Sequence, residues 1–215
     1  TSKKIIMSLL AKFFNQIKSS QEDIASDGLK HILQDSIYPQ NYLKNSIFTK
    51  TNIELPELNY TNQISKTELG RTDISGLDIN GEEILIIEAK FWASLTENQP
   101  ISYLKRLKEN SILLFVCPTL RKNSLFVELK KKLTDENIPF KPDNLILKLI
   151  LENGQQILVQ SWNEILEPIK EVLKENNVKG TFFITGHYLN TKSELVQKMI
   201  ENGNTVGNHT VNHKS

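Results

Sequence analysis

Two features of the sequence predict an α/β fold with a central mixed sheet flanked by helices. Short apolar runs of strand length alternate along the chain with amphipathic segments of helix length. Asn-Gly pairs at residues 80–81 and 153–154 each separate two apolar runs, which predicts two β-hairpins. No apolar run approaches the ~20 residues of a membrane span, so we expect no membrane partner.

The length, net charge and cysteine content of the chain limit the classes of protein to which it can belong. The chain has 215 residues and a formal net charge of +1, which fits one large or two small domains without a global basic field. The single cysteine, Cys117, lies in an apolar run and is expected to be a small buried residue. The N-terminal segment has no small-residue cleavage site, so a cytoplasmic location is expected. The oligomeric state stays open.

The N-terminal third predicts two helices followed by an irregular region. Apolar residues recur at helical spacing over residues 4–16, and Ser20 is placed to cap a second helix over 21–33. Glu22 lies in the first turn of that helix, where the helix dipole favours a negative charge. Residues 36–69 predict mainly loops, with a strand over 46–55.

The stretch from residue 70 to residue 103 carries the densest group of chemically useful side chains. A hairpin that turns at residues 80–81 places Glu88 and Lys90 on one strand face and brings Asp73 back toward them. Two carboxylates suit a hard divalent cation such as Mg²⁺ or Mn²⁺, which acidifies water. The alternative is that these charges belong to a solvated strand face.

Alternating helices and strands are expected after this hairpin. Gln99 and Tyr103 share one face of a helix predicted over 97–108, whose basic end carries Lys105 and Arg106. These two side chains suit either phosphate contacts or a helix C-terminus. The remaining predicted elements are a buried strand over 111–117, a helix over 120–133, a hairpin of 145–151 with 156–160, and a helix over 163–176.

The spacing of the acidic and basic residues resembles a known nuclease superfamily. Asp73, fourteen intervening residues and then Glu88-Ala89-Lys90 are similar to the motif of the PD-(D/E)XK nucleases. Gln99 and Tyr103 resemble the Gln-x-x-x-Tyr element of exonuclease-type members. The resemblance covers about residues 12–160 and implies a restriction-endonuclease-like core.

The same resemblance implies an activity and a role for each residue. Asp73 and Glu88 would hold Mg²⁺ or Mn²⁺, Lys90 would orient the attacking water, and Gln99 and Glu22 would support the site. Nucleic-acid contacts would come from Tyr103, Lys105 and Arg106. The implied function is metal-dependent phosphodiester hydrolysis, with DNA as the expected partner. A non-catalytic nucleic-acid-binding protein on the same fold is an alternative.

The last part of the chain resembles a different family. After residue 172 we expect a strand over 179–185, a helix over 193–201 and a short strand leading into His209 and His213. The segments GTFFITG, at residues 180–186, and VGNHTVNH, at residues 206–213, resemble the polysaccharide deacetylase (NodB-homology) family. This resemblance covers about residues 172–215.

The second resemblance implies zinc chemistry. His209 and His213 would be two ligands of a zinc ion that activates water for amide hydrolysis. No Thr-Phe-Asp-Asp-Gly-like strand precedes them, so we expect no deacetylase activity from this chain alone. A zinc-dependent deacetylase fragment is thus the alternative function. The expected division is a nuclease-like domain over 1–165 and a truncated α/β deacetylase-like segment over 166–215, whose origin as a natural fusion, a truncation or an artificial join stays open.

Overall fold

The structure is a computed structural model, which describes residues 21–62, 65–66, 70–176, 179, 181–185, 190 and 193–210. Residues 19–170 form one compact unit, and residues 171–215 belong to a second. The predicted helix over residues 4–16 lies outside the described residues. None of the helices in the described ranges is long and apolar enough to cross a membrane.

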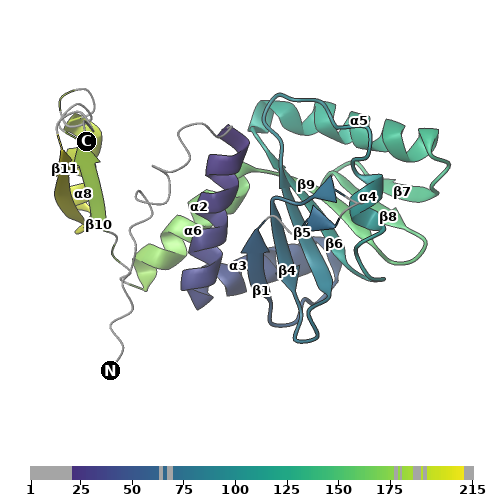
Figure 1. Ribbon diagram of the computed structural model, residues 1–215, viewed down its shortest axis with the longest axis horizontal. Helices are drawn as coiled ribbons and strands as arrows, with labels where there is room; N and C mark the ends of the chain where they lie inside the picture. The colour runs from purple at the N-terminus through teal and green to yellow at the C-terminus, as the bar shows by residue number, and fades with distance from the viewer. Residues whose placement is uncertain are drawn as a thin grey trace. The chain divides into compact units, whose positions relative to one another are not determined.

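The larger unit is an α/β structure built on one mixed sheet (Figure 1). Its helices are α2 (Gln21–Asp35), α3 (Ile37–Thr51), α4 (Ile101–Leu104), the 3-10 helix η1 (Thr119–Arg121) and α5 (Lys122–Asp135). Helix α6 (Trp162–Glu175) begins in this unit and continues past its last residue, Lys170. The strands of its main sheet are β1 (Asn59–Asn62), β4 (Ile74–Leu77), β5 (Glu83–Ala89), β6 (Ile112–Cys117), β7 (Phe140–Asp143), β8 (Lys148–Leu151) and β9 (Gln156–Ser161). A small separate hairpin consists of β2 (Ser65–Lys66) and β3 (Gly70–Arg71).

The main sheet is parallel at its centre and antiparallel on both sides. The strand order is β1-β4-β5-β6-β9-β8-β7, in which β5, β6 and β9 run parallel. All six residues of β6 are buried, as expected for a parallel strand covered on both faces. The expectation of a central mixed sheet flanked by helices is therefore confirmed.

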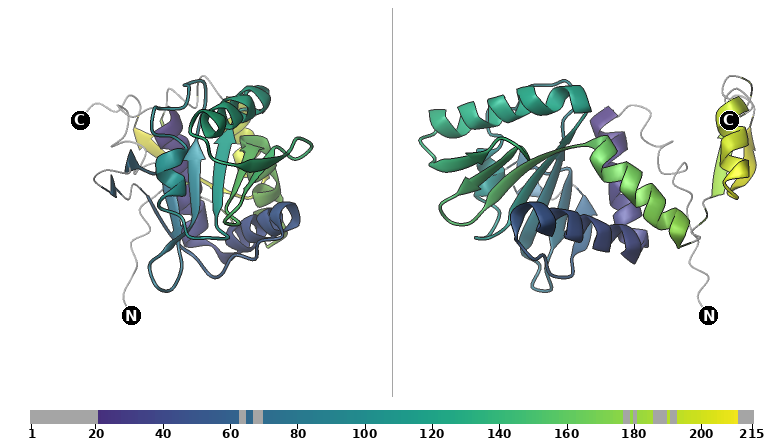
Figure 2. Two further views of the ribbon diagram at one scale, coloured as in Figure 1. Left: turned by 90° about the vertical axis from the view of Figure 1, so that its right-hand side faces the viewer. Right: turned by 180° about the vertical axis from the view of Figure 1, so that it is seen from behind.

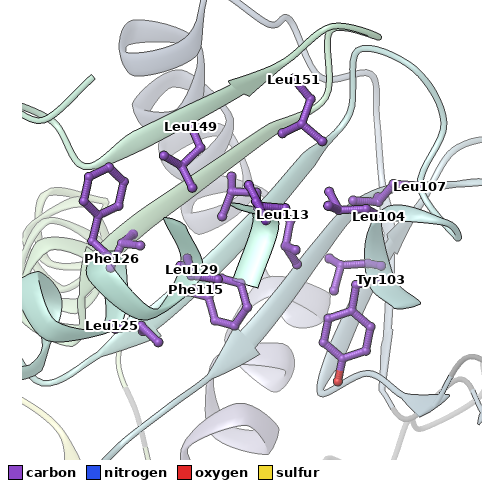
Figure 3. Packing of buried hydrophobic residues seen from close by; sticks show 14 of the residues in the cluster. Tyr103, Leu104, Leu107, Leu113, Phe115, Leu125, Phe126, Leu129, Leu149 and Leu151 are labelled. Carbon is purple, nitrogen blue, oxygen red and sulfur yellow. The ribbon is translucent and has the colours of Figure 1, made fainter. Parts of the chain in front are cut away.

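One face of this sheet packs against α4 and α5. Apolar side chains of α5, such as Phe126 and Leu129, meet Leu113 and Phe115 of β6 in a buried cluster (Figure 3). Side chains alternate between the faces of a strand, so Ile86 and Glu88 of β5 also point toward this side of the sheet. The face that carries Glu88 is therefore closed by α4 and α5.

The opposite face packs against α2 and α3. Helix α2 contacts β1, β4 and β5, and its Leu29 and Leu33 are buried. Gln156 Nε2 donates to the Thr51 carbonyl at 3.1 Å, and Lys148 Nζ donates to the Lys50 carbonyl at 2.8 Å. These bonds satisfy carbonyl groups at the C-terminus of α3, as a helix end requires. The rotated views in Figure 2 show α3 and α5 on opposite sides of the sheet.

The sequence-based expectation for residues 36–69 was wrong, because this region contains the helix α3 and the strand β1, which were both expected to be loops or, over 46–55, a strand. Residues 37–51 form α3, and no strand spans 46–55 in the described structure. Pro39 lies in the first turn, where its missing N–H costs no intrahelical hydrogen bond. Leu43, Ile47 and Thr51 then follow at intervals of four residues and form the buried stripe of the helix.

The smaller unit contains a strand, a helix and a strand. They are β10 (Thr181–Thr185), α8 (Ser193–Glu201) and β11 (Thr205–Thr210), and β10 pairs in parallel with β11. Helix α8 contacts β11, and its Val196 is buried. The predicted strand–helix–strand order of this segment is confirmed.

Candidate functional site

The β4–β5 hairpin brings the predicted acidic residues together. Its turn contains Gly81 with φ +79°, and its ladder pairs Ile74 with Ile87. Continuing that antiparallel register by one step places Asp73 opposite Glu88, and opposite residues share a face. Asp73 Oδ2 also accepts a hydrogen bond from the Ala89 amide at 2.8 Å. The two carboxyl groups are therefore neighbours at the end of β5.

Lys90 completes this group at the carboxyl end of β5. Its backbone amide donates to the Val116 carbonyl at 2.9 Å, which extends the β5–β6 pairing by one residue. Its ammonium Nζ lies 3.3 Å from Glu88 Oε1. Glu88 and Lys90 are 4% and 6% exposed, so both charges lie inside the fold and not on a solvated strand face.

Glu88 is only partly satisfied by hydrogen bonds. Its Oε1 accepts from Gln99 Nε2 at 2.6 Å and lies beside the Lys90 ammonium. Its Oε2 is buried and has no hydrogen-bond partner in the described structure. A buried carboxylate oxygen without a donor is costly unless a proton or a cation occupies the site.

The electrostatics of Glu88 follow from this environment. Burial, and to a smaller extent the neighbouring Asp73 charge, together raise the pKa of the Glu88 carboxyl from its ordinary range to about 7. The Lys90 ammonium opposes both effects by favouring the charged form. Near neutral pH, both the protonated and the ionised states of the group are therefore populated.

Gln99 and Tyr103 contact this site from the segment that contains α4. The predicted helix over residues 97–108 is shorter, because α4 spans only four residues and Gln99 precedes it. Gln99 Nε2 nevertheless donates to the Tyr103 hydroxyl at 2.9 Å as well as to Glu88. The Tyr103 ring packs in the apolar cluster, while its hydroxyl points away from it (Figure 3).

The other predicted site residues lie elsewhere. Arg106 was expected to contact nucleic acid, but its guanidinium is buried in an ion pair with Glu83 and cannot reach a surface ligand. Tyr103 is 3% exposed and is likewise enclosed, whereas Lys105 is exposed. Glu22 lies in the first turn of α2, and its side chain is outside the described part of the chain.

Glu83 is a buried residue that the sequence pattern did not identify. Its carboxylate accepts from Arg106 Nε at 2.9 Å and from Ser75 Oγ at 2.7 Å, and Ser75 Oγ lies 2.9 Å from Thr72 Oγ1. An irregularity in the β4–β5 register beside Gly76 interrupts the regular alternation of faces next to Glu83. No simple alternation rule therefore distinguishes Glu83 from Glu82 and Ile84, which are half-buried.

The histidines of the smaller unit are described only in part. His209 lies in β11, close to the end at which β10 and β11 both finish, but its side chain is outside the description. His213 lies entirely outside the described residues. Within the described ranges, no group of three or more His, Cys, Asp or Glu side chains gathers as a metal site.

Comparison with known proteins identifies one family match. The family model described as polysaccharide deacetylase matches residues 147–215. The peptidoglycan-N-acetylmuramic acid deacetylase PdaA of Bacillus subtilis is 34% identical over 30% of this chain and 22% of its own length. A chitooligosaccharide deacetylase of Sinorhizobium fredii is 36% identical over 24% of each chain. No solved structure matches.

These matches cover only a part of each relative. An uncharacterised 30.6 kDa protein of Geobacillus stearothermophilus is 39% identical over 34% of this chain and 25% of its own length. The chain thus spans about a quarter of the curated relatives that it matches. The matched residues begin one residue before β8 and continue through β8, β9 and α6 into the smaller unit.

The comparisons overturn the predicted nuclease function. The comparisons give no support to a PD-(D/E)XK segment, whereas the family model and the relatives with a named activity reported above are deacetylases. The expected DNA partner is contradicted with it, and magnesium as the main cofactor is not supported, whereas zinc is compatible with the family match. Residues 147–215 of this chain are therefore similar to polysaccharide deacetylases.

Proposed function

We propose that this chain carries part of a zinc-dependent polysaccharide deacetylase that removes acetyl groups from an N-acetylated polysaccharide. The family match over residues 147–215 carries this proposal. Two kinds of named relative support the substrate class, because one acts on peptidoglycan and the others on chitooligosaccharides. Both substrates present an acetamido group on a sugar ring.

The arrangement of the smaller unit supports the proposal. Because β10 and β11 run parallel, their carboxyl ends lie at the same edge of the sheet, and His209 lies near that edge on β11. Neutral imidazoles are common zinc ligands, and His213 follows His209 by four residues. A bound zinc ion would lower the pKa of a water molecule and polarise the amide carbonyl.

The number of zinc ligands that residues 147–215 supply determines whether they could form a catalytic centre by themselves. Catalytic zinc sites usually have three protein ligands and one open position. His209 and His213 supply two, and the sequence offers no acidic strand of the family type upstream. We therefore propose zinc binding by this segment, with hydrolysis requiring a further ligand and a general base.

Zinc binding by the metal-free protein tests this proposal directly. We expect one zinc equivalent to bind in a calorimetric titration, with affinity at least about tenfold weaker in His209→Ala and in His213→Ala. His31→Ala is the matched control, because His31 lies in α2 beside Asp35. Equal zinc binding by all four proteins would contradict the proposed ligands.

An assay of released acetate separates binding from catalysis. Acetate would be measured with peptidoglycan and with chitooligosaccharide, each with and without zinc. Zinc binding without acetate release is the expected result for this chain. Zinc-dependent release that is lost in His209→Ala would show that the chain contains a complete catalytic centre.

A second candidate site is favoured by the geometry of the larger unit. We propose that Asp73 and Glu88 bind a divalent cation beside the fixed charge of Lys90. The buried and unpartnered Oε2 of Glu88 is the observation that carries this proposal, since a cation would satisfy it. The proposal requires no nucleic-acid partner.

Titration with Mn²⁺, followed by the paramagnetic resonance of the free ion, tests the second site. Asp73→Asn is expected to weaken Mn²⁺ binding at least about tenfold, because the amide supplies a neutral ligand in place of a charged one. Asp135→Asn is the control, since Asp135 is exposed and pairs with Lys131 on α5. Identical titrations for these two variants would rule out Asp73 as a ligand.

A further inference from the structure

Gln99 is held by hydrogen bonds at both ends of its side-chain amide. Its Nε2 donates to Glu88 Oε1 at 2.6 Å and to the Tyr103 hydroxyl at 2.9 Å. Its Oε1 accepts from the Thr96 amide at 3.2 Å. Both protons on Nε2 are thus used, which fixes the orientation of the amide group.

Tyr103 connects this amide to the strand region that precedes Asp73. Its hydroxyl accepts from Gln99 and donates to the Arg71 carbonyl at 2.9 Å. Arg71 lies in β3, two residues before Asp73. The Tyr103 hydroxyl therefore ties the α4 segment both to Gln99 and to the chain that leads into the acidic site.

Two further contacts anchor the segment that carries Tyr103. Arg106 is paired with Glu83 of β5, with both side chains almost completely buried. Gln155 Nε2 donates to the carbonyls of Leu104 and Leu107 at 2.9 and 2.8 Å. These bonds fix the backbone around α4 against the sheet, so that the Tyr103 hydroxyl has a defined position.

We propose that Tyr103 is a positioning residue for the Asp73–Glu88 site. Its hydroxyl orients the Gln99 amide and also interacts directly with the Glu88 carboxyl. Gln99 holds Glu88 by Oε1, which leaves Oε2 to meet a cation. The effect on cation affinity rests on the second site proposed above. The orientation of Gln99 does not depend on any cation.

The variant Tyr103→Phe removes only the hydroxyl and keeps the ring in its apolar cluster. The first readout is the side-chain amide signal of Gln99, measured by NMR in protein freed of metal by a chelator. Hydrogen exchange of that amide is expected to become at least about tenfold faster and its chemical shift to change, because one partner of Nε2 is lost. The second readout is Mn²⁺ affinity, which is expected to fall about three- to tenfold.

Tyr60→Phe is the matched control. Tyr60 is also buried, at 1% exposure, and its hydroxyl has no hydrogen-bond partner in the described structure. Its loss is expected to leave both readouts at their wild-type values. Gln99→Glu provides an independent variant, in which a carboxylate placed against Glu88 should change Mn²⁺ affinity more than the loss of the Tyr103 hydroxyl.

The two readouts separate the possible failures. An unchanged Gln99 amide signal in Tyr103→Phe would overturn the positioning role, whatever the cation affinity. Absence of Mn²⁺ binding in the wild-type protein would overturn the cation site and the effect on affinity, while a changed amide signal would still establish that Tyr103 orients Gln99. A large change in Tyr60→Phe would show that the response is not specific to Tyr103.

Discussion

The carboxyl group of Glu88 lies where its own charge is disfavoured. It is buried next to Asp73, and burial is the largest cause of its raised pKa of about 7. Lys90 offsets part of this effect through its ammonium group. Because the folded-state pKa exceeds the ordinary value of 4.5, the folded protein binds this proton more tightly than the unfolded chain.

The free energy of unfolding is therefore expected to depend on Glu88 between about pH 4.5 and pH 7. The stability contributed by the bound proton is complete below pH 4.5 and is lost as the pH rises toward 7, by about 3 kcal/mol at most. Glu88→Gln should remove this slope, which urea denaturation in chelator at several pH values would measure. Glu152→Gln, at an exposed turn, serves as the control, and a slope unchanged in Glu88→Gln would contradict the assignment.

Burial also sets the ionisation of the Cys117 thiol. Cys117 is a free, buried cysteine in β6, as the apolar run around it predicts. Burial raises the pKa of its thiol to about 11, so the reactive thiolate is scarce at neutral pH. The thiol therefore acts as a small apolar side chain in the sheet.

At the scale of elements, the α4 segment is joined to the hairpin by polar contacts in an otherwise apolar layer. Arg106 and Glu83 form a doubly hydrogen-bonded ion pair with exposed side-chain fractions of 0% and 1%. The Ser75 hydroxyl of β4 and the hydroxyl of Thr72, two residues before β4, extend this contact. A buried pair of this kind is costly to break because the remaining charge stays in a low-dielectric environment.

Arg106→Ala is accordingly expected to lower the free energy of unfolding by roughly 3–5 kcal/mol. Lys105→Ala, one residue earlier and exposed, should change it by less than about 0.5 kcal/mol. Chemical denaturation of the three proteins measures both values. A similar cost for the two variants would mean that the buried ion pair contributes no more than a surface charge.

The chain contains two units, whose sheets differ in how many neighbouring strands and covering helices stabilise them. In the larger unit, β5, β6 and β9 lie side by side with both neighbours present and helices on both faces. In the smaller unit, β10 pairs with β11 in a sheet of two described strands. Two-stranded sheets are marginal by themselves, so the two units are expected to open at different free energies.

Hydrogen exchange followed by mass spectrometry would detect this difference. Peptides from β5, β6 and β9 are expected to exchange most slowly, whereas peptides from β10 and β11 should exchange at least about a hundredfold faster. Exchange at one common rate in both units would show that the chain unfolds as a single cooperative body.

The deacetylase match crosses the boundary between these units. Its first part includes β9, whose two edges are already paired with β6 and β8. A strand–helix–strand connection commonly places its two strands side by side in parallel. Both edges of β9 are therefore occupied within the larger unit, and β10 pairs with β11 in the smaller unit.

Local sequence patterns were sufficient to predict much of the architecture. The Asn-Gly turns, the apolar runs and the capped amphipathic helices act over a few residues, so the sequence alone predicted the β4–β5 and β8–β9 hairpins, β6, α5 and the strand–helix–strand order near the C-terminus. Helix α3 was not predicted because its turn-forming residues suggested a loop, although its buried side chains recur every four residues. The motifs near the C-terminus also indicated the deacetylase resemblance that the family match supports.

Only the tertiary structure decided what the charged side chains do. A motif of Asp73, Glu88 and Lys90 does not show whether its charges are buried, and the spacing that suggested a nuclease was not supported by any related protein. Likewise, Arg106 has the sequence context of a surface cation, yet the register irregularity beside Gly76 and the position of α4 bury it against Glu83. Local spacing fixes which residues are neighbours along an element, whereas packing between elements determines solvent access, and solvent access sets both charge and chemistry.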